Sequence, residues 1–179
     1  LATLATHPRV GSLGLQFSRG WDESIDRQKG RFVKEWGSAS WEDAILQGPH
    51  LHVSNPMYKQ PNPTMKSNED WSPVDLETLP SDATPVTSYK PAGDRDTYDA
   101  AYTHWGDTSA RDHYRIAWRA MAANTGERTL IPAMIPPGTA HPNGVFSVGS
   151  PELPLPRLVL TLGGLSSLLA DFTIRALPK

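Results

Sequence analysis

Hydrophobic and polar positions alternate most clearly in the stretch 112–121. Successive side chains of an extended backbone face opposite sides. One side of this stretch is mainly aromatic and apolar: Tyr114, Ile116, Trp118 and Ala120. The other side carries two arginines: Arg115, Ala117, Arg119 and Met121. The pattern therefore predicts a strand with an aromatic face, which we assign to the core, and a cationic face.

The residues that follow predict a second strand. Asn-Thr-Gly-Glu at 124–127 is turn chemistry, and an apolar extended run at 128–135 comes next. Pro-Pro-Gly at 136–138 ends that run. Together these signals predict a hairpin over about 112–135.

Leucines recur at spacings of three and four from 158 to 177, which predicts a helix with one apolar face, although Gly163 and Gly164 weaken or kink it. The fold class expected is α+β. A mixed or mostly antiparallel sheet surrounds the hairpin, and the C-terminal helix packs on its apolar face.

Seven prolines and few apolar residues fall in the middle of the chain. This composition is too polar for an independent core, so we read 55–97 as a long Pro-rich arm or excursion. The flanking parts, 1–54 and 98–179, are then two pieces of one domain, the second holding the hairpin and the helix.

The composition limits the kinds of site that this chain can form and the class of protein to which it can belong. With no cysteine, the chain has no disulfide, thiolate zinc site or cysteine nucleophile. No apolar run is long enough to predict a membrane span, and the absence of a secretory signal favours a cytoplasmic protein. The 179 residues begin with Leu rather than Met, so we expect a fragment of a larger protein. The 17 prolines and 14 glycines predict much loop.

The formal net charge of −2 argues against a non-specific nucleic-acid coat. It leaves room for a module that reads DNA through a local basic cluster, while other domains supply most of the phosphate affinity. Arg111, Arg115, Arg119 and Arg128 form such a cluster in the sequence.

Three catalytic or metal patterns are weak. Asn55-Pro56-Met57-Tyr58 approaches the Asn-Pro-Pro-Tyr motif of adenine methyltransferases, but its third residue is Met and no Gly-rich cofactor loop precedes it, so we favour a turn. His50 and His52 would share one strand face, yet no third metal ligand is marked, and no metal is expected. Ser166 lacks the Gly-x-Ser-x-Gly elbow of a hydrolase.

The hairpin offers better candidates for DNA contact. Arg115 and Arg119, four apart, would project from one strand face about 13 Å apart, and guanidinium suits guanine edges and phosphates. Asn124, Arg128 and Thr129 lie at or after the turn, where polar side chains could reach a groove. The alternatives carry equal weight: internal ion pairs for the two strand arginines, and ordinary turn-making for the other three residues.

Several segments resemble one protein family. They are Tyr-Arg-Ile-Ala-Trp-Arg at 114–119, Asn-Thr-Gly-Glu-Arg-Thr-Leu-Ile at 124–131 and Ile-Pro-Pro-Gly at 135–138, with flanking matches at 45–50, 55–59, 165–175 and 177–178. This combination of segments, over roughly 41–179, resembles the target-recognition region downstream of the catalytic domain in large adenine-specific DNA methyltransferases. Those include the fused restriction-modification enzymes of the Eco57I type and the methyltransferases of phage-defence systems.

The resemblance implies that the chain recognises a target sequence on double-stranded DNA and adjoins the catalytic domain of its parent chain. S-adenosylmethionine would be the cofactor of the parent enzyme, while the fragment itself would hold no cofactor and no catalytic residue. The alternative is a structural or protein-interaction domain of a bacterial defence enzyme. A third class is a stand-alone enzyme whose site the sequence does not reveal.

Overall fold

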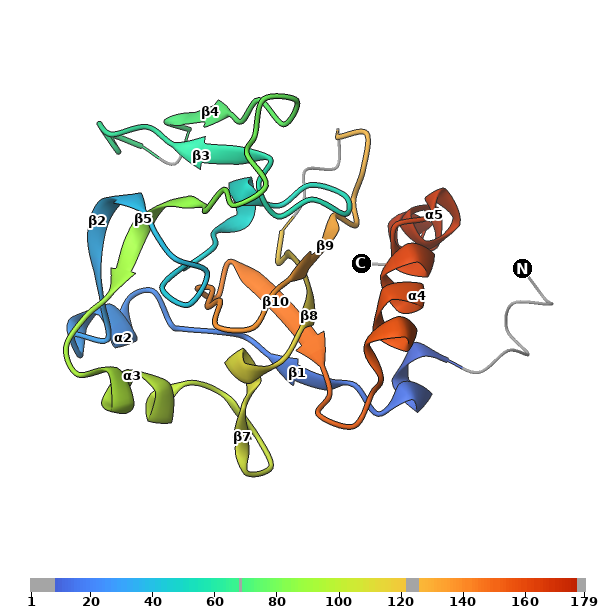
Figure 1. Cartoon of the computed structure of the whole chain (residues 1–179). Coiled ribbons are helices and arrows are strands. Elements are labelled where there is room, and N and C mark those ends of the chain that lie inside the picture. Colours follow the sequence, from blue (N-terminus) through green and yellow to red (C-terminus); the bar gives the residue numbers. More distant parts are fainter. Residues whose placement is uncertain (1–8, 68, 122–125, 177–179) are drawn as a thin grey trace.

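The computed structural model describes residues 9–67, 69–121 and 126–176. Within these ranges the chain is α+β, as the sequence predicts, with a four-stranded antiparallel sheet, several two-stranded sheets and two helices at the C-terminal end (Figure 1). The elements outside the sheets and the C-terminal pair are short: η1 (Val10–Leu13), α2 (Ile25–Gln28), η2 (Gly48–His50), α3 (Arg95–Ala101) and η3 (Ala110–Asp112).

The four-stranded sheet has the order β1-β10-β8-β9. Its strands are β1 (Gln16–Ser18), β8 (Arg115–Arg119), β9 (Pro132–Ile135) and β10 (Val145–Gly149). The predicted pairing of the hairpin is confirmed, because β8 and β9 are antiparallel neighbours, with Arg115 opposite Ile135 and Trp118 opposite Pro132.

The second strand of the hairpin is shorter than the sequence predicts. It begins at Pro132 instead of residue 128. The backbone N–H groups of Thr129 and Leu130 both donate to the carboxylate of Asp171, each at 2.7 Å. These donors are therefore satisfied by α5 and have no need of a neighbouring strand.

Both faces of β8 are covered, the cationic face as well as the aromatic face that was assigned to the core. Ile116 packs under Leu158 and Leu162. Ala117, on the opposite face, lies in a separate apolar cluster. Tyr114, expected in the core, precedes β8 and lines an open groove near the start of α4, where it stays 43% exposed.

The C-terminal segment forms two helices where one was expected. They are α4 (Leu155–Leu165) and α5 (Leu168–Ala176), bent by 62° relative to each other. The chain breaks at Ser166 and Ser167, because the Ser167 hydroxyl accepts from the backbone N–H of Ala170 and so caps α5. In the described part of the chain no single helix could cross a membrane, and only this bent pair has the combined length and hydropathy.

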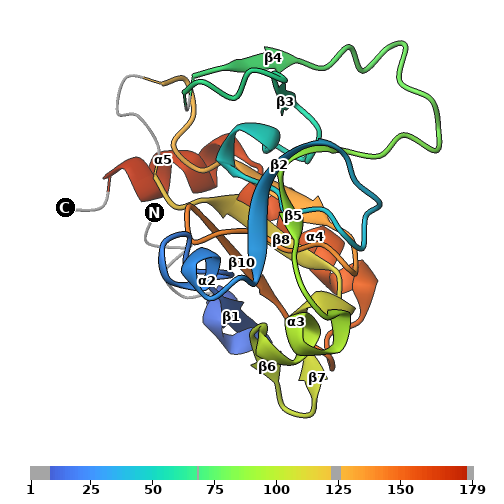
Figure 2. The same ribbon diagram turned by 90° about the vertical axis from the view of Figure 1, so that its left-hand side faces the viewer.

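The Pro-rich segment 55–97 is tied to the interior at one end. β5 (Val86–Pro91) lies within it and pairs antiparallel with β2 (Phe32–Ser38), burying Thr87, Ser88 and Tyr89. Its first half makes a small separate hairpin, which Figure 2 shows above the body of the molecule. That hairpin is β3 (Lys59–Pro61) and β4 (Trp71–Pro73).

An aromatic cluster fills the other side of the interior. Trp21 donates from its indole N–H to the Tyr98 hydroxyl at 3.0 Å, and its ring lies 5.1 Å from that of Tyr102. The neighbouring short sheet, β6 (His104–Trp105) with β7 (Thr108–Ser109), contributes Trp105 to the same cluster. This cluster meets the end of β8 that carries Arg115, through the Tyr102 hydroxyl.

Candidate nucleic-acid interface

Arg115, the first predicted DNA contact, lies in the interior with an exposed fraction of 0%. Its guanidinium donates to the Tyr102 hydroxyl at 3.2 Å and to the carbonyl oxygen of Thr139. The same group lies 5.8 Å over the Tyr102 ring. Burial lowers the pKa of Arg115. In this structure Arg115 braces the segment after β9, and its side chain is not available to a DNA groove.

His141 lies beside this buried arginine. Its Nε2 is 2.8 Å from the Ser147 hydroxyl, and the ring is fully buried. Burial lowers the pKa of His141 to about 3, and the positive charge of Arg115 acts in the same direction. The imidazole is therefore neutral at physiological pH, and the positive charge of this part of the interior comes from Arg115 and the neighbouring buried Arg111.

Arg119, the second predicted contact, occupies a different environment. It is half-buried, and one Nη donates to the carbonyl oxygen of Leu51 at 2.5 Å. Its buried Nε–H has no partner among the residues that the structure describes. Burial lowers the pKa of Arg119. Arg119 therefore holds the chain near Leu51 and still has an unused hydrogen-bond donor.

Arg128 and Thr129 attach the segment after the turn to the C-terminal helices. Arg128 donates to the carbonyl oxygen of Ser166, and the Thr129 hydroxyl accepts from Arg175 at 2.9 Å. The Nη1 of Arg128 is buried without a described partner. Asn124, the remaining predicted residue, lies outside the described residues. Arg128 thus resembles Arg119 in combining one structural hydrogen bond with one unused donor.

His52 and Tyr58 join these two arginines, although the sequence reasoning did not select either of them for DNA contact. The rings of His52 and Tyr58 lie 4.5 Å apart. Burial lowers the pKa of His52, and the charges of Arg119 and Arg128 lower it further, against the opposing effect of Glu127. The hydrogen bonds agree with this arrangement, because Arg119 donates to Leu51, next to His52, and Arg128 donates to Ser166, whose hydroxyl lies 3.1 Å from that of Ser54. We call His52, Tyr58, Arg119, Glu127 and Arg128 the outer cluster.

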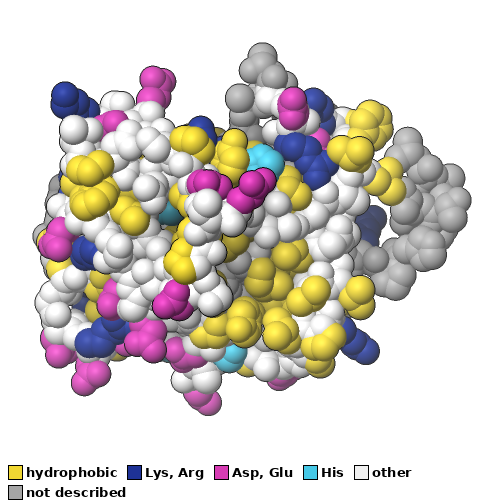
Figure 3. All heavy atoms as spheres, turned by 45° about the horizontal axis from the view of Figure 1, so that its top comes forward, with side chains coloured by type: hydrophobic (Ala, Val, Ile, Leu, Met, Phe, Trp, Pro, Cys, Tyr) yellow, Lys and Arg dark blue, Asp and Glu magenta, His cyan; other side chains and the backbone are white. Residues whose placement is uncertain are grey.

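His52 and Glu127 are exposed, and the segments that carry the outer cluster lie toward the top of Figure 1. In Figure 3, which brings that side forward, cationic, acidic and histidine side chains lie next to one another beside hydrophobic ones. The surface there is mixed in charge and not uniformly basic. Such a surface suits a few specific contacts better than general attraction to a polyanion.

The segment that carries His52 and Tyr58 is a tight reversal. His52 and Asn55 exchange backbone hydrogen bonds at 2.7 and 3.0 Å, and Ser54 between them has a φ of 61°. The Asn55 side chain accepts from the backbone N–H of Met57 at 2.8 Å. The turn expected at Asn55-Pro56-Met57-Tyr58 is confirmed, and the side-chain oxygen that a base-flipping motif would use is engaged in that turn.

The proposed pair of histidines does not share a face. His50 is buried in η2, where its Nε2 lies 2.9 Å from the carbonyl oxygen of Val86, and burial lowers its pKa to about 4. His52 is exposed and belongs to the outer cluster. No group of three or more potential metal ligands occurs among the described residues.

The outer cluster could have been found in part from the sequence. Its two arginines were selected, but His52 was considered only as a partner of His50. The arginines come from β8 and from the segment before β9, whereas His52 and Tyr58 lie more than 60 positions earlier, so no spacing links them.

No protein-family model, no curated protein and no solved structure matches the chain.

Proposed function

We propose that the chain recognises a target sequence on double-stranded DNA for an adenine-specific DNA methyltransferase or a fused restriction-modification enzyme. On this proposal methyl transfer and S-adenosylmethionine binding belong to the catalytic domain of a cytoplasmic parent protein. The proposal rests on the resemblance of 41–179 to such regions and on one structural observation. Arg119 and Arg128 are both half-buried, each is held by one hydrogen bond to a backbone carbonyl, and the charges of both act on the exposed His52.

Guanidinium groups that are partly exposed and already held in position are well suited to DNA. Each arginine is already positioned by a hydrogen bond to a backbone carbonyl, so little further side-chain entropy is lost on binding. The parts of these guanidinium groups that face solvent would donate to phosphate oxygens, or to O6 and N7 of guanine. Glu127, which is exposed beside them, could accept from the amino group of cytosine. The set thus offers both backbone contact and base discrimination.

Arg115 has no place in this surface. Its role in the proposal is indirect, since it stabilises the end of the strand whose other end carries Arg119. Thr129 is also indirect, because its backbone and hydroxyl are both engaged with α5. The proposed DNA contacts are therefore Arg119 and Arg128, with His52, Tyr58 and Glu127 beside them.

A second candidate, a protein-interaction domain, is favoured by another observation. Large hydrophobic side chains of α4 and α5 face the solvent, including Leu160 at 76% and Leu168 at 75% exposure. A contiguous apolar surface of this kind often marks a binding face. The two functions use different residues, so they can be tested separately and need not exclude each other.

The test of the DNA proposal is selection from a random duplex library by the purified 179-residue chain. The bound fraction is sequenced after repeated rounds at low salt and again at moderate salt. We expect enrichment of a short motif, with affinity that falls as salt rises by a slope of about 1 for each phosphate contact. Enrichment should disappear for the variant Arg119→Ala/Arg128→Ala.

Arg157→Ala is the matched control, because Arg157 is an exposed arginine of α4 outside the outer cluster. It should enrich the same motif as the wild type. A library that stays random after selection, at both salt concentrations, would contradict target recognition by this chain. Equal loss of enrichment in the control would show general charge attraction and would also contradict it.

A further inference from the structure

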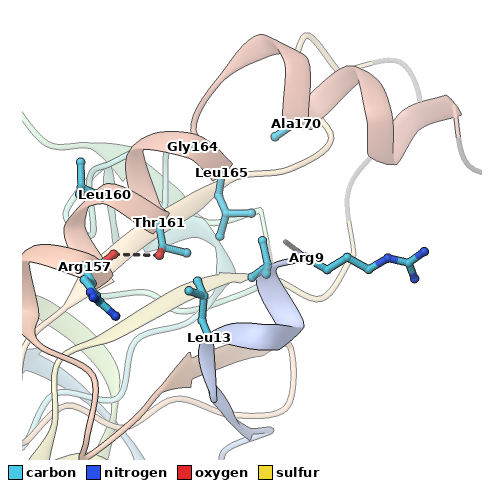
Figure 4. A pocket seen from close by; sticks show the side chains of 9 residues that line it. Arg9, Leu13, Arg157, Leu160, Thr161, Gly164, Leu165 and Ala170 are labelled. Atoms are coloured by element: carbon cyan, nitrogen blue, oxygen red, sulfur yellow. Dashed lines mark hydrogen bonds between the residues drawn. The ribbon is translucent and has the colours of Figure 1, made fainter. Parts of the chain in front are cut away.

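A groove lies between η1 and the two C-terminal helices, and none of its lining residues belongs to the outer cluster. Its volume is about 480 Å³, within the range of about 300–1,000 Å³ usual for binding pockets. The floor is apolar and comes from Val10, Leu13, Leu160, Leu165 and Ala170. In Figure 4 Leu13 and Leu165 point toward one another across the space.

The charged residues that line the groove are all cationic. Arg9 and Arg157 stand at its rim, and among the described residues no Asp or Glu lines it. In Figure 4 Arg9 extends outward from the rim. Both arginines are exposed, and neither forms an ion pair with a described residue. The only acid of α4 and α5, Asp171, is buried against the backbone of Thr129 and Leu130.

The apolar surface continues beyond the groove. Val159, Leu169 and Phe172 are each at least half exposed on the same two helices, and Leu168 is more exposed still. Burial of such side chains against a partner would remove apolar area from water and so favour binding. A face with this much unburied apolar area is therefore suited to a partner that is itself apolar along one side.

We propose that this groove binds an amphipathic helix of a protein partner, with leucine-like side chains on the apolar floor and carboxylates opposite Arg9 and Arg157. α4 has 11 residues and is therefore about 16 Å long. A partner helix of about three turns would match that length. The inference does not rest on DNA recognition, because none of its residues belongs to the outer cluster.

Charge separates this occupant from a second copy of the chain. A twofold interface places the same patch on both sides. Arg9 and Arg157 of each copy would then add to the positive charge of the other, with no exposed carboxylate from α4 or α5 to balance them. The hollow form of the groove, lined from three elements, favours side chains that insert from a helix over the broad surface of a lipid bilayer.

The probe is a synthetic 15-residue helical peptide with leucines on one face and glutamates on both flanks. Its binding to the 179-residue chain is measured by fluorescence anisotropy. A second peptide has lysines in place of the glutamates, and the leucines are unchanged. We expect micromolar binding of the glutamate peptide and at least tenfold weaker binding of the lysine peptide. Leu160→Glu should abolish binding, and Arg157→Glu should reverse the preference.

Leu160 is highly exposed, so its replacement should leave the melting temperature unchanged. Leu76→Glu is the matched control, since Leu76 is an exposed leucine outside the groove. Equal affinity for the two peptides, no binding of either, or unchanged binding by Leu160→Glu would overturn the proposal. Two other results would also overturn it, in each case with no binding of the glutamate peptide. One is that the chain self-associates and Leu160→Glu abolishes this self-association. The other is that the chain binds vesicles with anionic lipid and Leu160→Glu abolishes that binding.

Discussion

Arg115 and Arg119 stand four residues apart on one strand, yet they have opposite environments. Arg115 is completely buried and donates to the Tyr102 hydroxyl and the Thr139 carbonyl oxygen. Arg119 is half-buried, donates to one carbonyl oxygen and keeps an unused N–H. The alternation of a strand assigns both residues to one face, but the chain that covers that face decides which one meets solvent.

The largest expected effect concerns the inner arginine. Arg115→Ala would leave the acceptors on Tyr102 and Thr139 without a donor and open a cavity, at a cost of about 3 to 5 kcal/mol. Urea unfolding measures this loss. Arg115→Met, which keeps the stem and removes the charge, should cost clearly less. If Arg115→Ala unfolds at the same urea concentration as the wild type, the residue is not a brace.

The next effect is the pH dependence of folding stability that the two buried histidines, His141 and His50, produce. Burial lowers the pKa of His141 to about 3 and that of His50 to about 4. In the unfolded chain each has a pKa of about 6.5. Below that pH the unfolded state takes up protons that the folded state does not. Stability is therefore complete above about pH 6.5 and is lost as the pH falls toward the folded pKa values.

At pH 5 this loss is about 2 kcal/mol for each histidine. The free energy of unfolding, measured from pH 7.5 to pH 5, should fall with a slope to which these two histidines contribute about two protons and the lowered pKa of His52 a further part. His141→Gln, which can still hydrogen bond to Ser147, should reduce the slope by about one proton. A slope that is the same for His141→Gln and the wild type would show that His141 titrates normally in the fold.

A smaller effect is expected at the anchor of the outer arginine. Asp171→Ala removes the carboxylate that accepts from Thr129 and Leu130, at a cost of about 2 kcal/mol. The amide hydrogens of these two residues should exchange faster with solvent, as measured by NMR, and Arg128 should lose its position. Asp75→Ala, at an exposed acid outside both sites, is the control. Unchanged protection of both amides would contradict the assigned anchor.

The pairing of β8 with β9 could be predicted, because it depends on local signals. Alternating residues, a turn sequence and Pro-Pro-Gly at 136–138 lie within 30 positions of one another. The break between α4 and α5 could be predicted from the sequence only in part. Gly163 and Gly164 indicated a weak point, but the chain breaks two residues later, where Ser167 caps the next helix.

The burial of the Arg115 side chain could not be predicted from the alternating pattern of its strand. Tyr102 and Thr139, which cover it, come from segments on either side of the hairpin, and their approach depends on the order β1-β10-β8-β9. The outer cluster could not be predicted as a whole for the same reason, because its residues come from segments that are far apart in the sequence. Arg119 is recognisable as a candidate, but His52 and Tyr58 reach it only through the tight reversal at Ser54, whose backbone N–H donates to Pro132 of β9.

The measurement that tests the account most directly compares duplex binding and stability in the same variants. Arg119→Ala and Arg128→Ala, in a 179-residue chain bound to the selected duplex, should each lower affinity about tenfold, which corresponds to about 1.4 kcal/mol. Each should lower the free energy of unfolding by less than about 1 kcal/mol. Arg115→Met should do the reverse, with lower stability and unchanged affinity at a temperature where it is folded. Equal affinity of Arg119→Ala, Arg128→Ala and the wild type would contradict the division of this hairpin into an inner brace and an outer DNA-contacting surface.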